Sequence, residues 1–416
     1  MAQSIGQPPA AGKLVDKLYV ASIVAAAGML LALLEADVVI SRAQPLANFA
    51  FDSWGYALGR DFLNTWIGGR SAFSGGPAAW FDFATYNAVL QQITGRADYP
   101  LHFWSYPPHL LLFTWPLALM PYLPAYALWC IGGLALYLLA AFAGGADRRN
   151  VLLLALTPAV AVNVFYGQNG FLTAALLIGG LANLDRRPIA AGILFGILTI
   201  KPQIGLLVPV LLVTTGRWRV IAAAVGATAA LVTAASFWFG LDIWPEFFSK
   251  VMPQQRLLMI EAGKVGWTMV SSTFVQARLI GLPIDAAWAL QGVSSCCALA
   301  SVVWAYWRRR DPVLSQALFM TATFLFSPWM TSYDMVVFGW VVAMLRARSD
   351  NSLADHGLAM ALWMLPAAML PFGAARMPVA VLVLAAFAGR LVWRLYRAET
   401  RRVAAGAPSA AVSPAA

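Results

Sequence analysis

The chain of 416 residues is 61% hydrophobic and only 11% charged, whereas a soluble domain is about 45–50% apolar and about 25% charged. This composition excludes a set of soluble domains, a disordered chain and a small secreted scaffold, and it indicates one all-α polytopic membrane protein. The formal net charge is +10. In a membrane protein such an excess of Lys and Arg usually lies at the ends of cytoplasmic loops. Nucleic-acid binding is not expected, because no basic stretch is interleaved with aromatic residues.

The first predicted span covers residues 18–40. Lys13 and Lys17 precede it, and no small-residue cleavage site follows it as in a signal peptide. The run is long enough to cross a bilayer. Two lysines ahead of a span predict a cytoplasmic N-terminus.

Basic residues cluster between the later apolar runs, and placing every cluster in the cytoplasm predicts out-and-back helical hairpins. Residues 110–119 are expected to form a short tilted or re-entrant helix, because a second full crossing there would put the arginine pairs outside. This reasoning gives about 12 spans with both termini in the cytoplasm. Beyond the first, the spans cover residues 125–142, 151–166, 171–184, 189–200, 204–215, 220–239, 286–307, 314–326, 335–345, 358–370 and 379–396.

Two long outer loops, residues 41–106 and 241–285, mix aromatic, acidic and amide residues. We expect amphipathic helices in the first loop, lying along the outer membrane face. The near-helical spacing comes from Phe62, Trp66, Ile67 and Phe73, and then from Tyr86, Val89, Leu90 and Ile93. Residues 1–400 are expected to form a single transmembrane domain, and the Ala/Pro-rich residues 401–416 a disordered cytoplasmic tail.

No metal and no cofactor are expected. The three cysteines lie in apolar stretches without the spacing of metal ligands, and the three histidines are too few and too scattered for a histidine-built site. These residues are Cys130, Cys296, Cys297, His102, His109 and His356.

Asp61 stands out among the outer acids because it directly precedes a predicted amphipathic segment. A carboxylate at that position can point from a helix N-terminus into a cavity at the membrane surface. Position alone favours a plainer role, because aspartate is a common helix N-cap.

Lys201 is the only cation in the apolar stretch between Arg187 and Arg217. A charge inside a membrane segment costs at least about 2.5 kcal/mol, so such a residue is a functional candidate by default. An outward lysine beside the helix break at Pro202 is what a lipid phosphate requires. The alternative is that the lysine snorkels to the outer interface.

Further polar turns lie on the same predicted face. Tyr106 and His109 flank two prolines, which suit either a cavity rim or a plain membrane-entry turn. The segment Gly167-Gln168-Asn169 joins two hairpin helices, and turn chemistry alone explains its glycine and asparagine. A third turn, residues 327–334, ends in Tyr333 and Asp334.

Together these stretches resemble the GT-C superfamily of integral-membrane glycosyltransferases, and more narrowly glycosyltransferase family 87, the polyprenol-phosphate-sugar-dependent group. The resemblance covers about residues 55–345 and rests on the order of its motifs. They are Asp61-Phe62, Gly75, Tyr106-Pro107-Pro108, Pro116, Pro121, Gly167-Gln168-Asn169, Lys201-Pro202, Pro209 and Ser327-Pro328. The chain departs from the family at Tyr333-Asp334, where some relatives carry a histidine.

The resemblance implies a GT-C-type fold and an inverting transfer of a sugar, mannose above others, from a polyprenyl-phosphate donor to a glycolipid or polysaccharide acceptor. The reaction would occur on the outer face of the bacterial inner membrane. Asp61 becomes the expected catalytic base, and one carboxylate suffices because the phosphate leaves without protonation. Lys201, assisted by Arg256 and Lys264, is expected to hold the donor phosphate.

Substrate hydroxyl groups would be oriented by Tyr106, His109, Gln168, Asn169 and Tyr333. The expected partners are the donor, the acceptor and membrane lipids, and the chain is expected to act as a monomer.

Two other functions fit a multi-span protein. A transporter or lipid-linked sugar flippase often shows paired halves with matching broken helices, which this sequence lacks, and it does not need a long aromatic outer loop. A polysaccharide ligase with a lipid-diphosphate donor would need more cationic residues facing the pyrophosphate. A screen of sugar donors separates these possibilities.

Overall fold

The computed structural model describes residues 9–40, 49–52, 54–71, 81–261, 266–308 and 310–404. These residues are almost wholly helical, and within these ranges β pairing is confined to two isolated bridges, Phe51 with Ala57 and Val270 with Thr331. Six of the described helices are long and apolar enough to cross a membrane, or seven if one bent helix pair is a single span. The prediction of an all-α polytopic membrane protein is therefore confirmed.

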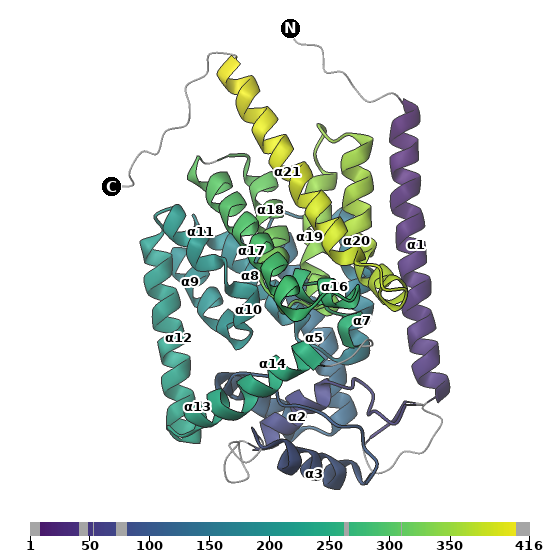
Figure 1. The fold of residues 1–416 in the computed structure, drawn as a ribbon, viewed down its shortest axis with the longest axis vertical. Helices are drawn as coiled ribbons and strands as arrows, with labels where there is room; N and C mark the ends of the chain where they lie inside the picture. The colour runs from purple at the N-terminus through teal and green to yellow at the C-terminus, as the bar shows by residue number, and fades with distance from the viewer. Residues whose placement is uncertain are drawn as a thin grey trace.

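The first half of the chain runs from the long N-terminal helix to the helix at the far edge of the bundle (Figure 1). Its elements are α1 (Pro9–Ile40), α2 (Phe62–Ser71), α3 (Phe83–Thr94), η2 (Pro108–Leu110), α4 (Leu111–Thr114), η3 (Trp115–Leu119), α5 (Tyr122–Ala143), η4 (Arg148–Asn150), α6 (Val151–Ala155), α7 (Pro158–Tyr166), α8 (Gly170–Asn183), α9 (Pro188–Ile197), η5 (Leu198–Ile200), α10 (Pro202–Gly205), α11 (Val208–Thr214) and α12 (Trp218–Phe239).

The second half begins with a segment that returns beneath the bundle and ends in the longest C-terminal helix. Its elements are α13 (Ile243–Glu246), the π-helical turn η6 (Phe247–Val251), α14 (Met252–Glu261), α16 (Thr273–Leu279), α17 (Ile284–Trp307), α18 (Pro312–Phe326), η7 (Ser332–Val336), α19 (Val337–Arg346), α20 (Leu353–Ala374) and α21 (Val379–Ala404). Prolines open many of these helices, because a proline in the first turn removes only an N–H that has no helical partner.

Each predicted span falls on a helix or a helix pair. The full-length helices are α1, α5, α12, α17, α20 and α21, and α6–α7 form a pair bent by 53°. The remaining predicted spans fall on shorter helices, so the expected number of about 12 spans includes segments too short to cross a bilayer alone. Residues 110–119 form the short, broken η2–α4–η3 segment, and the first outer loop contains α2 and α3. Phe73 lies outside the described residues.

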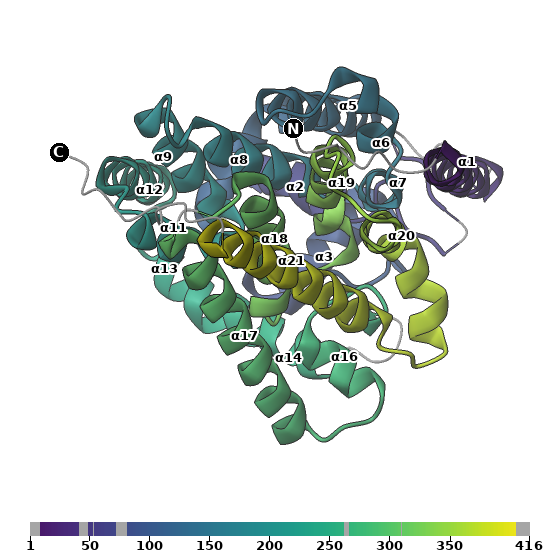
Figure 2. The same ribbon diagram turned by 90° about the horizontal axis from the view of Figure 1, so that it is seen from above.

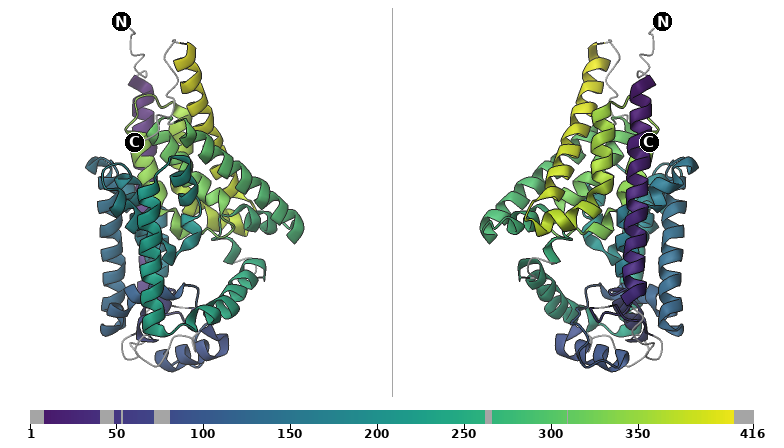
Figure 3. Two further views of the ribbon diagram at one scale, coloured as in Figure 1. Left: turned by 90° about the vertical axis from the view of Figure 1, so that its left-hand side faces the viewer. Right: turned by 90° about the vertical axis from the view of Figure 1, so that its right-hand side faces the viewer.

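The start of α1 and the end of α21 lie at one end of the bundle, and α2 and α3 lie at the other (Figure 1). Seen from above, α1 and α12 stand at opposite edges and α18 lies near the middle (Figure 2). The side views place α14 and α3 together at the end away from the chain termini (Figure 3). Both described ends of the chain therefore lie away from the loop helices.

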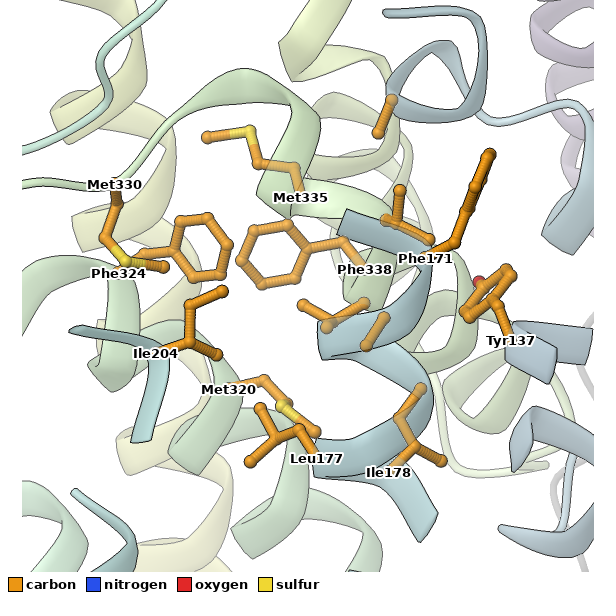
Figure 4. Close-up of a cluster of buried hydrophobic side chains, with 14 of the residues drawn as sticks. Tyr137, Phe171, Leu177, Ile178, Ile204, Met320, Phe324, Met330, Met335 and Phe338 are labelled. Carbon is orange, nitrogen blue, oxygen red and sulfur yellow. The ribbon is translucent and has the colours of Figure 1, made fainter. Parts of the chain in front are cut away.

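The core of the helix bundle, next to the loop helices α2 and α3, is built around Phe324 and Phe338. Their ring centroids are 4.7 Å apart. Ile204, Phe171 and Met335 surround the pair (Figure 4). Each of these three residues follows closely on a polar turn, after Lys201, Asn169 and Asp334. The packed core therefore fixes three turns that come from distant parts of the sequence.

Candidate active site

The turn before α2 packs directly against the turn between α7 and α8. The backbone N–H of Asp61 donates to the Tyr166 carbonyl at 3.0 Å. Gly167 ends α7 with a φ of +59°, and a Cβ there would lie 2.6 Å from the Gly59 carbonyl oxygen. Only glycine permits this approach, which brings Gln168 beside Asp61.

One hydrogen bond holds the Asp61 carboxylate, and a second orients the amide that donates it. Gln168 Nε2 donates to Asp61 Oδ2 at 2.7 Å, and the Tyr106 hydroxyl donates to Gln168 Oε1 at 3.1 Å. Burial raises the pKa of the Tyr106 phenol well above its usual value, and the Asp61 and Asp334 charges raise it further, so the phenol stays protonated. The Asp61 side chain is 32% exposed, so a substrate can reach the carboxylate.

The first turn of α2 does not use this carboxylate as a cap. Its backbone N–H groups donate to carbonyl oxygens instead, Phe62 to Gly59 at 2.6 Å, Leu63 to Arg60 at 3.1 Å and Asn64 to Asp61 at 3.1 Å. The alternative reading of Asp61 as a side-chain N-cap is therefore wrong.

His102 faces the other oxygen of Asp61 and was not expected there. Its Nε2 lies 3.9 Å from Asp61 Oδ1, and its Nδ1 lies 3.0 Å from the Pro100 carbonyl oxygen. Because a carbonyl only accepts, Nδ1 carries a proton and Nε2 faces the carboxylate. Asn87 fixes the backbone of His102 with bonds of 2.9 and 3.1 Å. The sequence carried no signal for this placement beyond the residue type.

Lys201 is buried and paired. Its ammonium lies 2.5 Å from Asp334 Oδ1 and donates to Asn169 Oδ1 at 3.0 Å, and it sits 4.7 Å from the centroid of the Tyr333 ring. Lys201 is 5% exposed, so it does not snorkel to the interface. The expectation of a lone outward cation is corrected: the charge is buried and neutralised by a carboxylate 133 residues away.

Asp334 is itself anchored by the turn that contains it. Its Oδ2 accepts from the Thr331 hydroxyl at 2.7 Å, which forms part of a capping box at the start of η7. Asn163 of α7 donates to the Tyr333 carbonyl at 2.8 Å. The turn that follows α18 is thus fixed to both α7 and Lys201.

Two expected site residues, His109 and Arg256, do not join this cluster. His109 is buried with Nε2 at 3.2 Å from Thr199 Oγ1 and its ring 6.1 Å from that of Trp244. Arg256 is exposed on α14, and Lys264 lies outside the described residues. Among the residues that the structure describes, no three His, Cys, Asp or Glu side chains gather as a metal site would require.

An apolar groove of about 410 Å³ adjoins the cluster. Its lining comes from α5, α8 and the α4–η3 region, and the polar side chains in it are those of Gln168 and Asn169. Leu128 and Leu136 of α5 line this groove and are exposed at the surface of the bundle. Asn169 Nδ2 is buried and has no hydrogen-bond partner within the structure, which is uncommon for a buried donor.

The model of glycosyltransferase family 87 matches residues 104–328, more than half of the chain. The matched segment contains Tyr106, Gln168, Asn169 and Lys201, begins after Asp61 and ends before Tyr333. No curated protein and no solved structure matches the chain. With the membrane-spanning helices and the clustered polar turns, this match shows that the chain belongs to glycosyltransferase family 87, a family of GT-C-type membrane glycosyltransferases.

Proposed function

We propose that this membrane glycosyltransferase takes its sugar, mannose first among candidates, from a polyprenyl-phosphate donor. The acceptor is a hydroxyl group of a glycolipid or polysaccharide at the outer face of a bacterial inner membrane. One observation carries the proposal. Gln168 and Asn169 line the apolar groove, and these two residues contact Asp61 and Lys201. A hydrocarbon chain in the groove would therefore lie against the residues that hold a carboxylate and a cation.

Asp61 acts as the general base. Its carboxylate is reachable, and the bond from Gln168 directs one oxygen while the other faces His102. Asp61 takes the proton of the acceptor hydroxyl as that oxygen attacks the anomeric carbon from the face opposite the phosphate. A single carboxylate gives inversion, because retention requires a second, nucleophilic one. His102 Nε2 is the next group able to receive the proton.

Lys201 and Asn169 hold the donor phosphate. An ammonium has three hydrogens, and Asp334 and Asn169 receive two of them. Among the described residues, the buried donor Asn169 Nδ2 has no hydrogen-bond partner. A phosphate oxygen satisfies both groups, and the ammonium stabilises the charge of the departing phosphate.

Arg256 is a second cation in this role. Gln255, next to Arg256, donates to the Ser105 carbonyl at 2.6 Å. This hydrogen bond joins α14 to the segment just before Tyr106. Lys264 follows on the same outer loop.

The test is a donor screen. Purified protein in nanodiscs is given polyprenyl-phosphate sugars and the matching nucleotide sugars, together with a membrane lipid extract. We expect transfer from polyprenyl-phosphate donors alone, one polyprenyl phosphate released for each sugar transferred, and an inverted anomeric configuration by NMR. Transfer from nucleotide sugars, retained configuration, or passage of intact donor across the bilayer without cleavage would each contradict the proposal.

A further inference from the structure

Arg60, the residue before Asp61, has an unusual backbone. Its φ is +32°, and among the described residues only one other non-glycine residue, Arg376, has a positive φ. L side chains rarely adopt this region, and such residues persist where the surrounding structure holds them in place, often at functional sites. Gly59, which adopts such backbone freely, precedes Arg60 in the same turn. The arginine side chain at position 60 is therefore kept despite its backbone cost.

The Arg60 guanidinium lies among aromatic rings from two separate segments. One pair of rings belongs to the turn before Arg60 and the other to the last residues of α7. The distances from Cζ to the ring centroids are 5.0 Å for Trp54, 5.0 Å for Tyr56, 4.3 Å for Phe165 and 5.4 Å for Tyr166. A planar guanidinium can stack against several rings at once, which an ammonium cannot do.

A buried carboxylate fixes the guanidinium within these rings. Arg60 Nη2 lies 2.6 Å from Asp52 Oδ2, and the two side chains are 14% and 1% exposed. The second oxygen of Asp52 accepts the backbone N–H groups of Trp54 and Tyr56 at 2.9 and 3.0 Å. Asp52 therefore joins the Arg60 charge to the fold of the preceding turn.

The same end of α7 also holds Asp61. The ring of Tyr166 lies beside the Arg60 guanidinium, and the Tyr166 carbonyl oxygen accepts the backbone N–H of Asp61 at 3.0 Å. Two residues later, Gln168 donates to the Asp61 carboxylate at 2.7 Å. A shift of Arg60 relative to α7 would move the Asp61 backbone away from the amide that directs its carboxylate.

We propose that Arg60 is a positioning residue, which holds the Asp61 carboxylate in place by joining the Asp52–Tyr56 turn to the end of α7. The proposal rests on the proposed function for the role of Asp61 as base. Arg60 contacts no reacting atom, so its loss acts on the rate through Asp61. A displacement of about 1 Å at a catalytic group can lower the rate by about 100-fold.

The experiment compares Arg60→Lys, Asp61→Asn and the double variant. We expect Arg60→Lys to lower kcat by roughly 10- to 100-fold, with the donor KM changed by less than about threefold. The double variant should be no slower than Asp61→Asn, because a positioning residue has no effect once the carboxylate it positions is gone. Arg96→Lys is the matched control, since Arg96 pairs with Asp98 at 2.9 Å and lies 5.1 Å from the Phe51 ring. It should stay within about twofold of the parent.

Arg60→Gly tests the positioning role without backbone strain, because glycine adopts a positive φ freely. It also leaves the buried Asp52 carboxylate without its cation, so we expect its melting temperature to fall below that of Arg60→Lys, with the kcat of the folded protein at least as low. Parent-level kcat in Arg60→Gly, or a multiplicative loss in the double variant, would overturn the positioning role. A fully active Asp61→Asn would instead overturn the proposed function, so the two failures are distinguishable.

Discussion

Replacing Lys201 tests whether the buried ammonium binds donor phosphate or only neutralises Asp334. Lys201→Met leaves Asp334, whose side chain is 1% exposed, without its cation. Removing one partner of a buried ion pair costs about 3–5 kcal/mol. Asp334 keeps the Thr331 hydroxyl at 2.7 Å, so we expect a loss near the lower end, about 3 kcal/mol.

The double variant Lys201→Met/Asp334→Asn removes both charges. Neutral residues of similar size in place of a buried pair are often as stable as the pair, so the melting temperature should return close to that of the parent. Activity should not return. Loss of a group that stabilises developing charge costs about 10²- to 10³-fold in kcat, and the donor KM should remain raised.

The assay is thermal unfolding in nanodiscs alongside transfer kinetics at several donor concentrations. Asp334→Asn alone keeps the lysine and serves as the comparison. If the double variant recovers both its melting temperature and its transfer rate, Lys201 has a structural role only, and the donor phosphate must be held by another cation, with Arg256 next.

Three further results are expected. Asp61→Asn keeps the shape and folds, but it should lose about 10²-fold or more in kcat; near-parent transfer would assign the base elsewhere. Gly132→Phe should raise the KM for a long-chain donor more than for a short-chain one, because Gly132 lines the groove and a Cβ there would meet only Leu128 Cδ1, at 4.0 Å. Gly226→Phe on α12, where a Cβ meets no atom within 4 Å, is the control, and an equal effect of both would remove the groove from donor binding. In intact cells an impermeant thiol reagent should label Ser74→Cys and leave Arg217→Cys unlabelled; the reverse pattern would invert the topology.

The helices could be predicted closely because their ends are marked in the sequence. Prolines begin α7, α9, α10 and α18, and basic residues follow the apolar runs, so local chemistry alone locates the boundaries. The number of full membrane crossings was less predictable. An apolar run of 10 to 15 residues has the same sequence pattern whether it spans the bilayer or packs in the protein core.

The membership of the site was partly predictable, and its pairings were not. Tyr106, Gln168, Asn169 and Lys201 were singled out as polar residues in outer turns. Their partners lie far away in sequence: Gln168 reaches Asp61 across 107 residues, and Lys201 reaches Asp334 across 133. Such contacts follow from how whole helices pack, which no local pattern encodes.

His102 shows the same limit from the other side. Nothing in its flanking residues separates it from the other histidines, and only the fold of the first outer loop brings its Nε2 to 3.9 Å from Asp61. Arg256 lies outside the cluster, because the charge of a residue does not by itself predict where the fold puts it.

The shortness of α8 has a consequence for how deep the reaction lies. Its 14 residues extend about 21 Å at 1.5 Å per residue, against a hydrocarbon layer of about 30 Å. Charged residues 185–187 follow its C-terminal end and belong at the membrane boundary. With that end at one boundary, Gln168 and Asn169 at the other end would lie roughly 9 Å beneath the opposite boundary, or deeper if the helix tilts. A lipid headgroup would have to sink below the neighbouring headgroups to reach Gln168 and Asn169. The hydrated headgroups of ordinary phospholipids stay at the membrane surface, so the depth of the site alone would exclude them.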